Sequence, residues 1–246
     1  MTIHIAARKL LRRGQLSAPS PADRARVREL LFPARCALLV VDVQNDLVHP
    51  DGRVGPGRAR TVYAAALKQI NSLIGAARTA GVPVIYIGTE HGPGRDSGPY
   101  RAVRARRRRS PEGTCLAGTW GAEFAAELDG PRDGEQVVTK HGYDGFAASG
   151  LAQSLASAGR DTVVVGGVAT TLCVAATVVG AFEHGLYAIV PREATAASDA
   201  GQAKAALRRM ETHYGDVVPA DVVLDAWCAA EVAGSNHAVL PQVAPR

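Results

Sequence analysis

The sequence lacks a long hydrophobic run. Its longest apolar stretches, such as residues 36–41, are as long as a strand and fall well short of the roughly 18 residues that a membrane span requires. The first 21 residues are basic and are interrupted by Gly14, Pro19 and Pro21, so they contain no apolar segment of the kind found in a secretory signal. We therefore expect a soluble, cytoplasmic protein with no membrane partner.

Cysteines and aromatic residues are scarce. The four cysteines, at positions 36, 115, 173 and 228, show neither a C-x-x-C pair nor the spacing of a metal site. Without an export signal the compartment is expected to be reducing, so we expect free thiols and exclude a disulfide scaffold. Aromatic residues make up only 5% of the chain, so several of them near one site would be unusual.

Acidic residues are slightly outnumbered, at 23 against 28 Lys and Arg, and the net charge is +5. Six arginines of one segment account for this excess, because the charge without them is −1. They are Arg101, Arg104, Arg106, Arg107, Arg108 and Arg109. No aromatic residues alternate with them to stack on bases, so we predict no nucleic-acid partner. We interpret the segment as a solvated loop, or as a lid that favours an anionic substrate.

What the sequence does have is a regular alternation of two kinds of segment. Fully apolar runs are typical of strands that are buried on both faces of a parallel sheet, and they occur at 37–43, 82–88, 136–139, 162–167 and 186–191. Amphipathic, Ala-rich stretches predict helices at 61–80, 122–128, 147–158, 172–184 and 199–213. This alternation predicts a three-layer α/β/α domain with a doubly wound, mostly parallel sheet.

We expect one folded domain over residues 34–230, with a basic N-terminal arm over 1–33 and a C-terminal tail over 231–246. Residues 89–118 are interpreted as a variable, arginine-rich loop, since loops this long in α/β domains are usually lids or insertions. Ligands of such folds bind beyond the carboxyl ends of the strands. The residues that follow each predicted strand are therefore the candidates for chemistry.

Reactive side chains follow three of the predicted strands: Asp42, Lys140 and Cys173. Cys173 opens a helix, where the helix dipole and a neighbouring ammonium favour a thiolate. Asp42 would act as general base, because Asn45 and Asp46 are better placed to cap the next helix. Backbone N–H groups over residues 168–173 would bind an oxyanion. These groups together predict acyl transfer through a thioester.

Four ordered blocks of sequence carry a resemblance to a known family. They are residues 40–46 (VVDVQND), 118–123 (GTWGAE), 140–146 (KHGYDGF) and 167–174 (GVATTLCV). From about Ala34 to Trp227 the sequence resembles the isochorismatase-like cysteine hydrolases, in the amidohydrolase branch that includes N-carbamoylsarcosine amidase and ureidoacrylate amidohydrolase. The resemblance implies the isochorismatase-like hydrolase fold with a six-stranded sheet, and a homo-oligomer that is a dimer or a tetramer.

The resemblance also implies the roles of particular residues. Asp42, Lys140 and Cys173 would form a catalytic triad. A cis peptide bond between Val168 and Ala169 would turn the Ala169 N–H toward the oxyanion, beside the N–H of Cys173. Separately from the resemblance, and from its position near Asp42, Gln44 is interpreted as holding its neighbours by hydrogen bonds rather than contacting the substrate.

The metal cluster of the nicotinamidase branch has no clear counterpart. That branch has an Asp-x-His…His pattern after the second strand, whereas this region contains Glu90 and His91 side by side with no second histidine following. Metal sites need three or more converging ligands, so we predict no metal and no cofactor.

Four residues are candidates to contact the substrate because of their positions relative to the triad. They are Leu47, Trp120, Tyr143 and Phe146. For Trp120 and Phe146 the alternative is that they are packing anchors.

The predicted activity is hydrolysis of a carbon–nitrogen bond, other than a peptide bond, in a small amide, carbamoyl or ureido compound. Two alternatives stay open. A vinyl-ether hydrolase acting on isochorismate would resemble this chain in Asp42 and Lys140 but can dispense with Cys173. A non-catalytic module would bind a polyanion through the arginine segment, and this binding would fall steeply with salt and be indifferent to Cys173.

Overall fold

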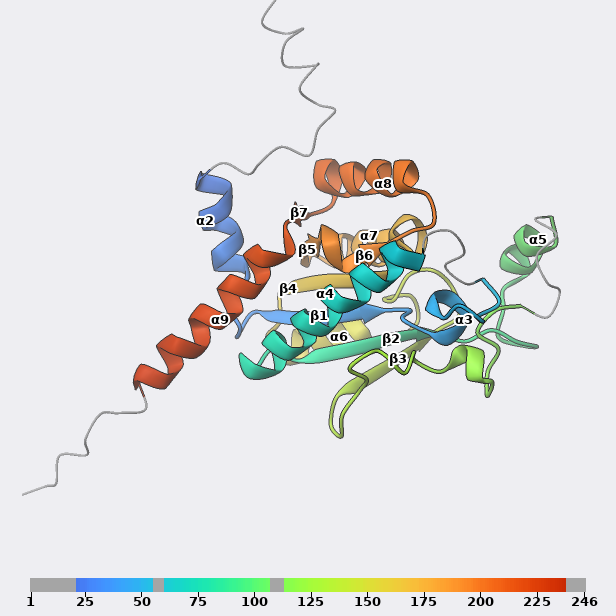
Figure 1. Ribbon diagram of the computed structural model, residues 1–246, viewed down its shortest axis with the longest axis horizontal. Coiled ribbons are helices and arrows are strands. Elements are labelled where there is room, and N and C mark those ends of the chain that lie inside the picture. Colours follow the sequence, from blue (N-terminus) through green and yellow to red (C-terminus); the bar gives the residue numbers. More distant parts are fainter. Residues whose placement is uncertain (1–20, 55–59, 107–112, 238–246) are drawn as a thin grey trace, which may run out of the picture.

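The computed structural model describes residues 21–54, 60–106 and 113–237 (Figure 1). Its centre is one sheet of seven strands in which every pair of strands is parallel. The strands are β1 (Cys36–Val41), β2 (Val84–Thr89), β3 (Gln136–Lys140), β4 (Thr162–Val168), β5 (Tyr187–Pro191), β6 (Thr195–Ala196) and β7 (Asp216–Val218). Their order is β3-β2-β1-β4-β5-β7, and β6 pairs with β4. The sheet therefore has seven strands rather than the expected six, because a two-residue strand, β6, joins it.

The central strands are buried on both faces, as their continuous apolar sequences predict. All residues of β1, β2 and β4 are buried. Successive residues of β1 belong to different cores: Leu38 and Val40 pack on one side of the sheet, and Leu39 and Val41 pack on the other. The edge strand β3 differs, since its Val137 is 51% exposed.

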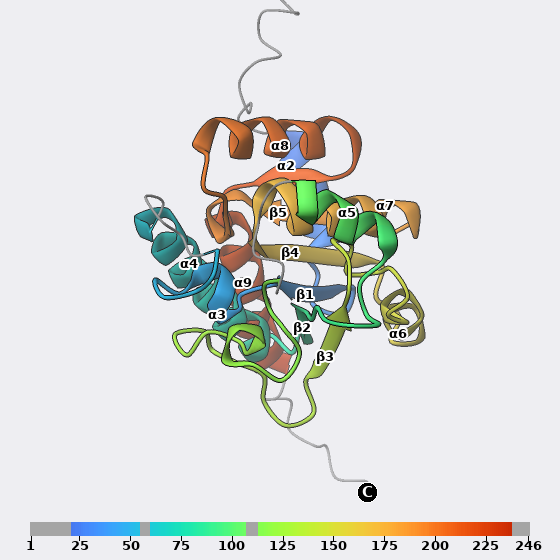
Figure 2. The same ribbon diagram turned by 90° about the vertical axis from the view of Figure 1, so that its right-hand side faces the viewer.

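Helices cover both faces of the sheet, which confirms the three-layer α/β/α architecture (Figure 2). On one side lie α2 (Pro21–Leu30), α4 (Arg60–Thr79) and α9 (Ala220–His237). On the other lie α6 (Leu151–Ser157), α7 (Ala175–Glu183) and α8 (Ala200–His213). Two further helices, α3 (Asn45–Val48) and α5 (Gly98–Arg106), lie beyond the carboxyl ends of the strands (Figure 1).

Several predicted helices differ from the observed ones. The prediction over 122–128 is wrong: this segment runs past the end of β1, where Ala125 N–H donates to Val43 O at 2.9 Å. The helix predicted over 172–184 is divided into a wider helical turn, Thr170–Val174, and α7. Helix α5 falls within the 89–118 segment, for which no regular structure was expected.

Helices α2 and α9 both contribute side chains to the core. The indole of Trp227, on α9, is fully buried and donates to Leu31 O at 3.2 Å, just after α2. Val27 and Leu30 join the same core from α2. The domain limits at residues 34 and 230 stay predictions. Residues 1–20 of the predicted arm, 238–246 of the predicted tail, and Arg107, Arg108 and Arg109 lie outside the described residues.

Gly167 provides a test of how tightly β4 packs against β1. Its φ is +128°, and a Cβ there would lie 2.0 Å from Val41 O. We expect Gly167→Ala to lower the free energy of unfolding by roughly 2–4 kcal/mol in urea titrations, from overlap and backbone strain. Gly75→Ala is the matched control, because Gly75 is exposed on α4 with nothing within 4 Å of an added Cβ. It should stabilise by roughly 0.5–1 kcal/mol, and equal effects at the two positions would contradict this account.

Candidate active site

The three reactive residues meet at the carboxyl edge of the sheet. Asp42 directly follows β1, Lys140 is the last residue of β3, and Cys173 lies in the helical turn after β4. The Lys140 Nζ donates to Asp42 Oδ2 at 2.7 Å and to the carbonyl oxygen of Gly142 at 2.9 Å. The Cys173 thiol lies close enough to both side chains to shift their pKa values. The structure therefore brings the predicted trio together.

The backbone of Asp42 has an unusual conformation. Its φ is +53°, in the left-handed region that non-glycine residues seldom adopt. The residue is fastened to the neighbouring strand by its N–H, which donates to Ile87 O at 2.8 Å, and the side chain is completely buried. Among the described residues, Asp42 Oδ1 has no hydrogen-bond partner. One carboxylate oxygen is thus held by Lys140 while the other is free to take a proton.

Burial and pairing act in opposite directions on these two groups. Burial raises the pKa of Asp42, and the Lys140 ammonium opposes that rise. Burial lowers the pKa of Lys140, but the nearby Asp42 carboxylate and Cys173 outweigh it, so the net pKa of Lys140 is raised. Lys140 therefore remains an ammonium at neutral pH. Breaking such a buried pair on one side costs about 3–5 kcal/mol, since the other charge is left uncompensated.

The expectation that Cys173 is poised as a thiolate is not met in the resting site. Burial raises the pKa of the Cys173 thiol well above its usual range, and the Asp42 carboxylate raises it further. Lys140 lowers it by less. The physical reason is that the helix terminus and the ammonium cannot offset the loss of water around the sulfur. The resting site therefore consists of a neutral thiol beside a carboxylate–ammonium pair.

The turn between β4 and α7 contributes backbone groups to the same site. The peptide bond between Val168 and Ala169 is cis. Ala169 O accepts hydrogen bonds from the N–H groups of Leu172 and Val174, which closes the turn. Ala169 and Cys173 both line the cavity described next.

A small cavity of about 120 Å³ lies over the trio. Asp42 and Cys173 line it, and the predicted contact residues Leu47 and Tyr143 line it as well. Apolar side chains form much of the wall. They include Val54, Tyr63, Val103, Val168 and Leu172.

Two predicted contact residues lie elsewhere in the described structure. Trp120 is 47% exposed, and its ring packs edge-on against that of His49, with centroids 5.0 Å apart. Phe146 is buried in the core that includes residues of α7, and its N–H donates to Asp144 Oδ1 at 2.9 Å. Phe146 is therefore a packing residue, whereas Trp120 lies at the surface and belongs to no core cluster of the described residues.

One part of the cavity wall was not predicted from the sequence. It is formed by the arginine-rich segment and by the end of β2. Tyr100, Val103 and Arg104 of α5 line the cavity, together with Thr89 and His91. From the sequence, His91 is weighed only as a metal ligand, and its position two residues after the end of β2 is the available signal. The spacing of Tyr100, Val103 and Arg104 at three and four residues was a second signal, because these positions share one face of a helix.

The residues after Asp42 tie the surrounding loops to the sheet. Gln44 acts as predicted: its Nε2 donates to Thr89 O at 2.9 Å, and its Oε1 accepts from Thr89 N at 2.8 Å. Asn45 and Asp46 are not helix caps. Asn45 Nδ2 donates to Trp120 O at 2.8 Å, and Asp46 Oδ2 accepts from Cys115 N at 2.7 Å. These bonds fix the far wall of the cavity.

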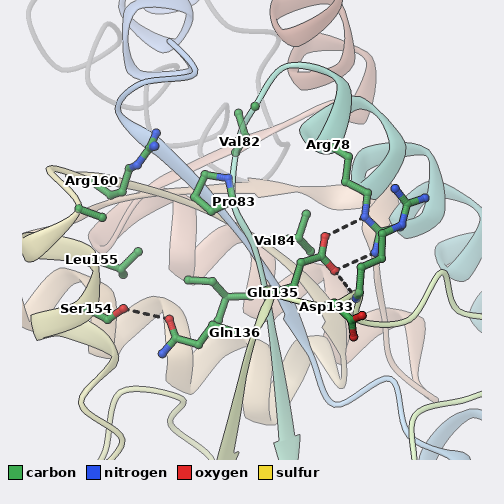
Figure 3. A pocket seen from close by; sticks show the side chains of 15 residues that line it. Arg78, Val82, Pro83, Val84, Asp133, Glu135, Gln136, Ser154, Leu155 and Arg160 are labelled. Atoms are coloured by element: carbon green, nitrogen blue, oxygen red, sulfur yellow. Dashed lines mark hydrogen bonds and ion pairs between the residues drawn. The ribbon is translucent and has the colours of Figure 1, made fainter.

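A larger hollow of about 580 Å³ lies at the opposite, amino end of β2 and β3 (Figure 3). Its main charged groups already pair with each other, since Arg78 Nε and Glu135 Oε1 are 2.8 Å apart. It contains none of the trio and lies away from the edge where α/β folds bind ligands. We therefore assign the chemistry to the smaller cavity.

Three further observations concern the described residues only. No group of three or more His, Cys, Asp or Glu side chains there is arranged to hold a metal ion, and the absence of a metal requirement stays a prediction. No helix there combines the length and the apolar character of a membrane span. All four cysteines are free thiols.

Comparison with known proteins agrees with this architecture. The family model for the isochorismatase domain matches residues 36–222. A ureidoacrylate amidohydrolase, RutB, of Methylobacterium radiotolerans is 32% identical over 200 residues, which cover 75% of this chain and 76% of that protein. The maleamate amidohydrolase of Pseudomonas putida is 30% identical over 190 residues, which cover 76% of this chain and 84% of that protein.

Solved structures show the same fold. A cysteine hydrolase from Pseudomonas syringae pv. phaseolicola superposes with a TM-score of 0.71 at 25% identity, over 80% of this chain and 94% of that one. The N-carbamoylsarcosine amidase from Thermoplasma acidophilum superposes with a TM-score of 0.62 at 28% identity, over 76% and 97% of the two chains.

The fold is the α/β/α architecture of the isochorismatase-like hydrolases. The chain belongs to the isochorismatase family. The names of its relatives confirm the expectation of an enzyme that hydrolyses carbon–nitrogen bonds other than peptide bonds.

The pKa of Cys173 can be tested by alkylation. The Asp42 carboxylate raises this pKa and the Lys140 ammonium lowers it. We therefore expect the pH profile of iodoacetamide labelling at Cys173 to shift to lower pH in Asp42→Asn and to higher pH in Lys140→Met, relative to the unmodified protein. Peptide mass mapping separates Cys173 from the exposed Cys228, and circular dichroism verifies folding. A profile that stays fixed, or moves upward, in Asp42→Asn would contradict the assigned electrostatics.

Proposed function

We propose that the protein is a cysteine-dependent amidohydrolase that cleaves the carbon–nitrogen bond of a small amide, carbamoyl or ureido compound through a thioester. The observation that carries the proposal is the arrangement at Asp42. One of its oxygens is held by Lys140 at 2.7 Å, while the other has no described partner and lies in the cavity wall with the Cys173 thiol. Relatives named for ureidoacrylate, maleamate and N-carbamoylsarcosine support the substrate class.

The first half-reaction forms the thioester. As Cys173 Sγ attacks the substrate carbonyl carbon, Asp42 Oδ1 takes the thiol proton. The carbonyl oxygen gains negative charge and is bound by the N–H groups of Ala169 and Cys173, each worth roughly 3–4 kcal/mol in comparable sites. The carbon–nitrogen bond then breaks, and Asp42 returns the proton to the departing ammonia or amine.

The second half-reaction regenerates the thiol. Asp42 takes a proton from a water molecule, whose oxygen attacks the thioester carbon, and the same N–H groups bind the oxyanion again. The carbon–sulfur bond breaks, the carboxylic acid leaves, and the proton passes from Asp42 to Cys173. Lys140 remains an ammonium throughout and keeps Asp42 ionised whenever a base is needed. Assembly into a dimer or tetramer and a cytoplasmic location stay predictions.

A neutral thiol beside a ready base fits this sequence of steps. The proton leaves sulfur only when a substrate is present to accept the electron pair, so the raised pKa of Cys173 does not prevent attack. It does protect the sulfur from indiscriminate reaction, because the thiolate is the reactive form.

The covalent step is tested by replacing the nucleophile. With maleamate and ureidoacrylate as substrates, we expect Cys173→Ala to lower kcat by roughly 10³-fold or more, as removal of a catalytic nucleophile does elsewhere. Its melting temperature should stay close to that of the unmodified protein. Cys228→Ala is the matched control, because Cys228 is exposed on α9 away from the cavity, and it should retain full activity.

Mass spectrometry of quenched reactions should show an acyl adduct on the peptide that contains Cys173. Turnover by Cys173→Ala within about tenfold of the unmodified enzyme would exclude the thioester route. Release of pyruvate from isochorismate by that variant would instead favour the vinyl-ether alternative.

A further inference from the structure

The cavity holds a cation that the proposed reaction does not use. Arg104, on α5, lines the same cavity as Cys173. Its NH1 donates to Tyr100 Oη at 3.0 Å and to Thr114 Oγ1 at 3.2 Å, and both of these acceptors are uncharged. Within the described chain no carboxylate lies within ion-pair distance of Arg104, whereas Arg95 pairs with Glu90 at 3.2 Å. Arg104 therefore has no anionic partner among the described residues, although its Cζ lies 5.6 Å from the centroid of the Tyr100 ring in a cation–π contact.

The direction of each hydrogen bond that connects Arg104 to Tyr100, His91 and Asp96 follows from which of these groups can donate and which can only accept. A guanidinium only donates, so Tyr100 Oη accepts from Arg104 and directs its own proton to His91 Nε2, 2.7 Å away. His91 Nδ1 then carries the ring proton and donates to Asp96 Oδ1 at 2.6 Å. The His91 and Tyr100 rings also stack, with centroids 4.5 Å apart. A series of hydrogen bonds from Asp96 through His91 and Tyr100 thus positions the Arg104 guanidinium.

Of the three residues in this support, His91 is buried, and Asp96 and Tyr100 are half-buried. His91 is 4% exposed and directly follows Glu90 at the end of β2, with its N–H donating to Cys115 O at 2.9 Å. Burial lowers the pKa of His91, so the ring is neutral and does not compete with Arg104 for an anion. The arrangement places one permanent positive charge on the wall and holds it still.

The donors that remain define the ligand chemistry. With both NH1 hydrogens engaged, Arg104 retains Nε and NH2, and these have no partner among the described residues. Parallel donors from one edge of a guanidinium match the two oxygens of a carboxylate. The surrounding wall is largely apolar, with Leu47, Val103 and Leu172, and so favours a short hydrocarbon spacer over further polar groups. At about 120 Å³ the cavity suits only a small molecule.

We propose that Arg104 is the specificity residue for a substrate carboxylate, so that the enzyme acts on small amides or ureides that bear a carboxylate at the end remote from the scissile bond. This inference rests on the proposed function, since it assigns the substrate class of the same cavity. Arg104 binds the carboxylate, and Tyr100, His91 and Asp96 are positioning residues that act through it.

The first test is a substrate pair that differs only in charge. Succinamate carries a carboxylate, and methyl succinamate replaces it with a neutral ester. We expect the unmodified enzyme to prefer succinamate in kcat/KM by roughly 10- to 100-fold, the usual value of a hydrogen bond to a charged group. Arg104→Met should abolish this preference through KM, and Arg104→Lys should retain part of it. Arg106→Met is the charge-matched control, since Arg106 is exposed at the end of the same helix, and should keep the preference.

The second test measures binding without turnover. Calorimetry of Cys173→Ala with succinate, glutarate and N-carbamoylglycine should give binding that weakens at least tenfold when Arg104→Met is added. Binding that depends on Arg104 without any amide turnover would support the carboxylate site and contradict the proposed function. Amide turnover with no preference for a carboxylate would support the proposed function and contradict the carboxylate site.

A merely structural role for Arg104 gives a different pattern. Arg104→Met would then lower kcat/KM equally for the acid and the ester, together with the melting temperature. That result would overturn the inference, as would equal binding of all three carboxylates with and without Arg104, or no binding of any of them.

Discussion

The buried ion pair between Lys140 and Asp42 is the interaction on which the rest of the site depends. Removing two opposite charges from water costs free energy, and burying one of them alone would cost far more. The pair exists because β1 and β3 end at the same edge of the sheet with β2 between them, so the ammonium reaches across to Asp42 Oδ2 at 2.7 Å. The sheet in turn must be covered on both faces to exclude water. Catalytic competence is therefore a property of the whole three-layer fold rather than of a local motif.

The pair leaves one carboxylate oxygen unused, and that asymmetry determines the chemistry. An Asp42 with both oxygens hydrogen-bonded would be a poor base, and an Asp42 without Lys140 would be protonated by burial alone. Because Lys140 holds Oδ2 while Oδ1 has no described partner, one oxygen remains able to accept a proton. The thiol of Cys173 borders the same cavity as this carboxylate. In the proposed reaction, negative charge would move from Asp42 to the substrate oxygen only during attack.

Much of this could be predicted from the sequence, for identifiable reasons. Fully apolar runs can hardly be anything but buried strands, and parallel strands place the residues that follow them at one edge, so Asp42, Lys140 and Cys173 were found. Side-chain direction in turns was not predictable. The Phe146 ring lies in the core, whereas Trp120 is largely exposed. Nor could local sequence show that burial outweighs the helix terminus at Cys173, since burial depends on residues far along the chain.

The role of the arginines could not be predicted from composition for a similar reason. Composition gives the number of charges, whereas function depends on where each charge lies. Arg104 and Arg106 are two residues apart and contribute equally to the net charge, yet a helix turns them about 200° apart. Arg104 borders the cavity, and Arg106 is exposed to solvent. The helical conformation of α5 creates this difference between the two arginines. The hydrogen bond between Tyr100 and His91 stabilises the position of Arg104. A segment interpreted as an irregular loop would distribute its arginines without preference. Folded as α5, it places Arg104 at the cavity and Arg106 in solvent, so the secondary structure of this segment distinguishes two arginines that composition counts alike.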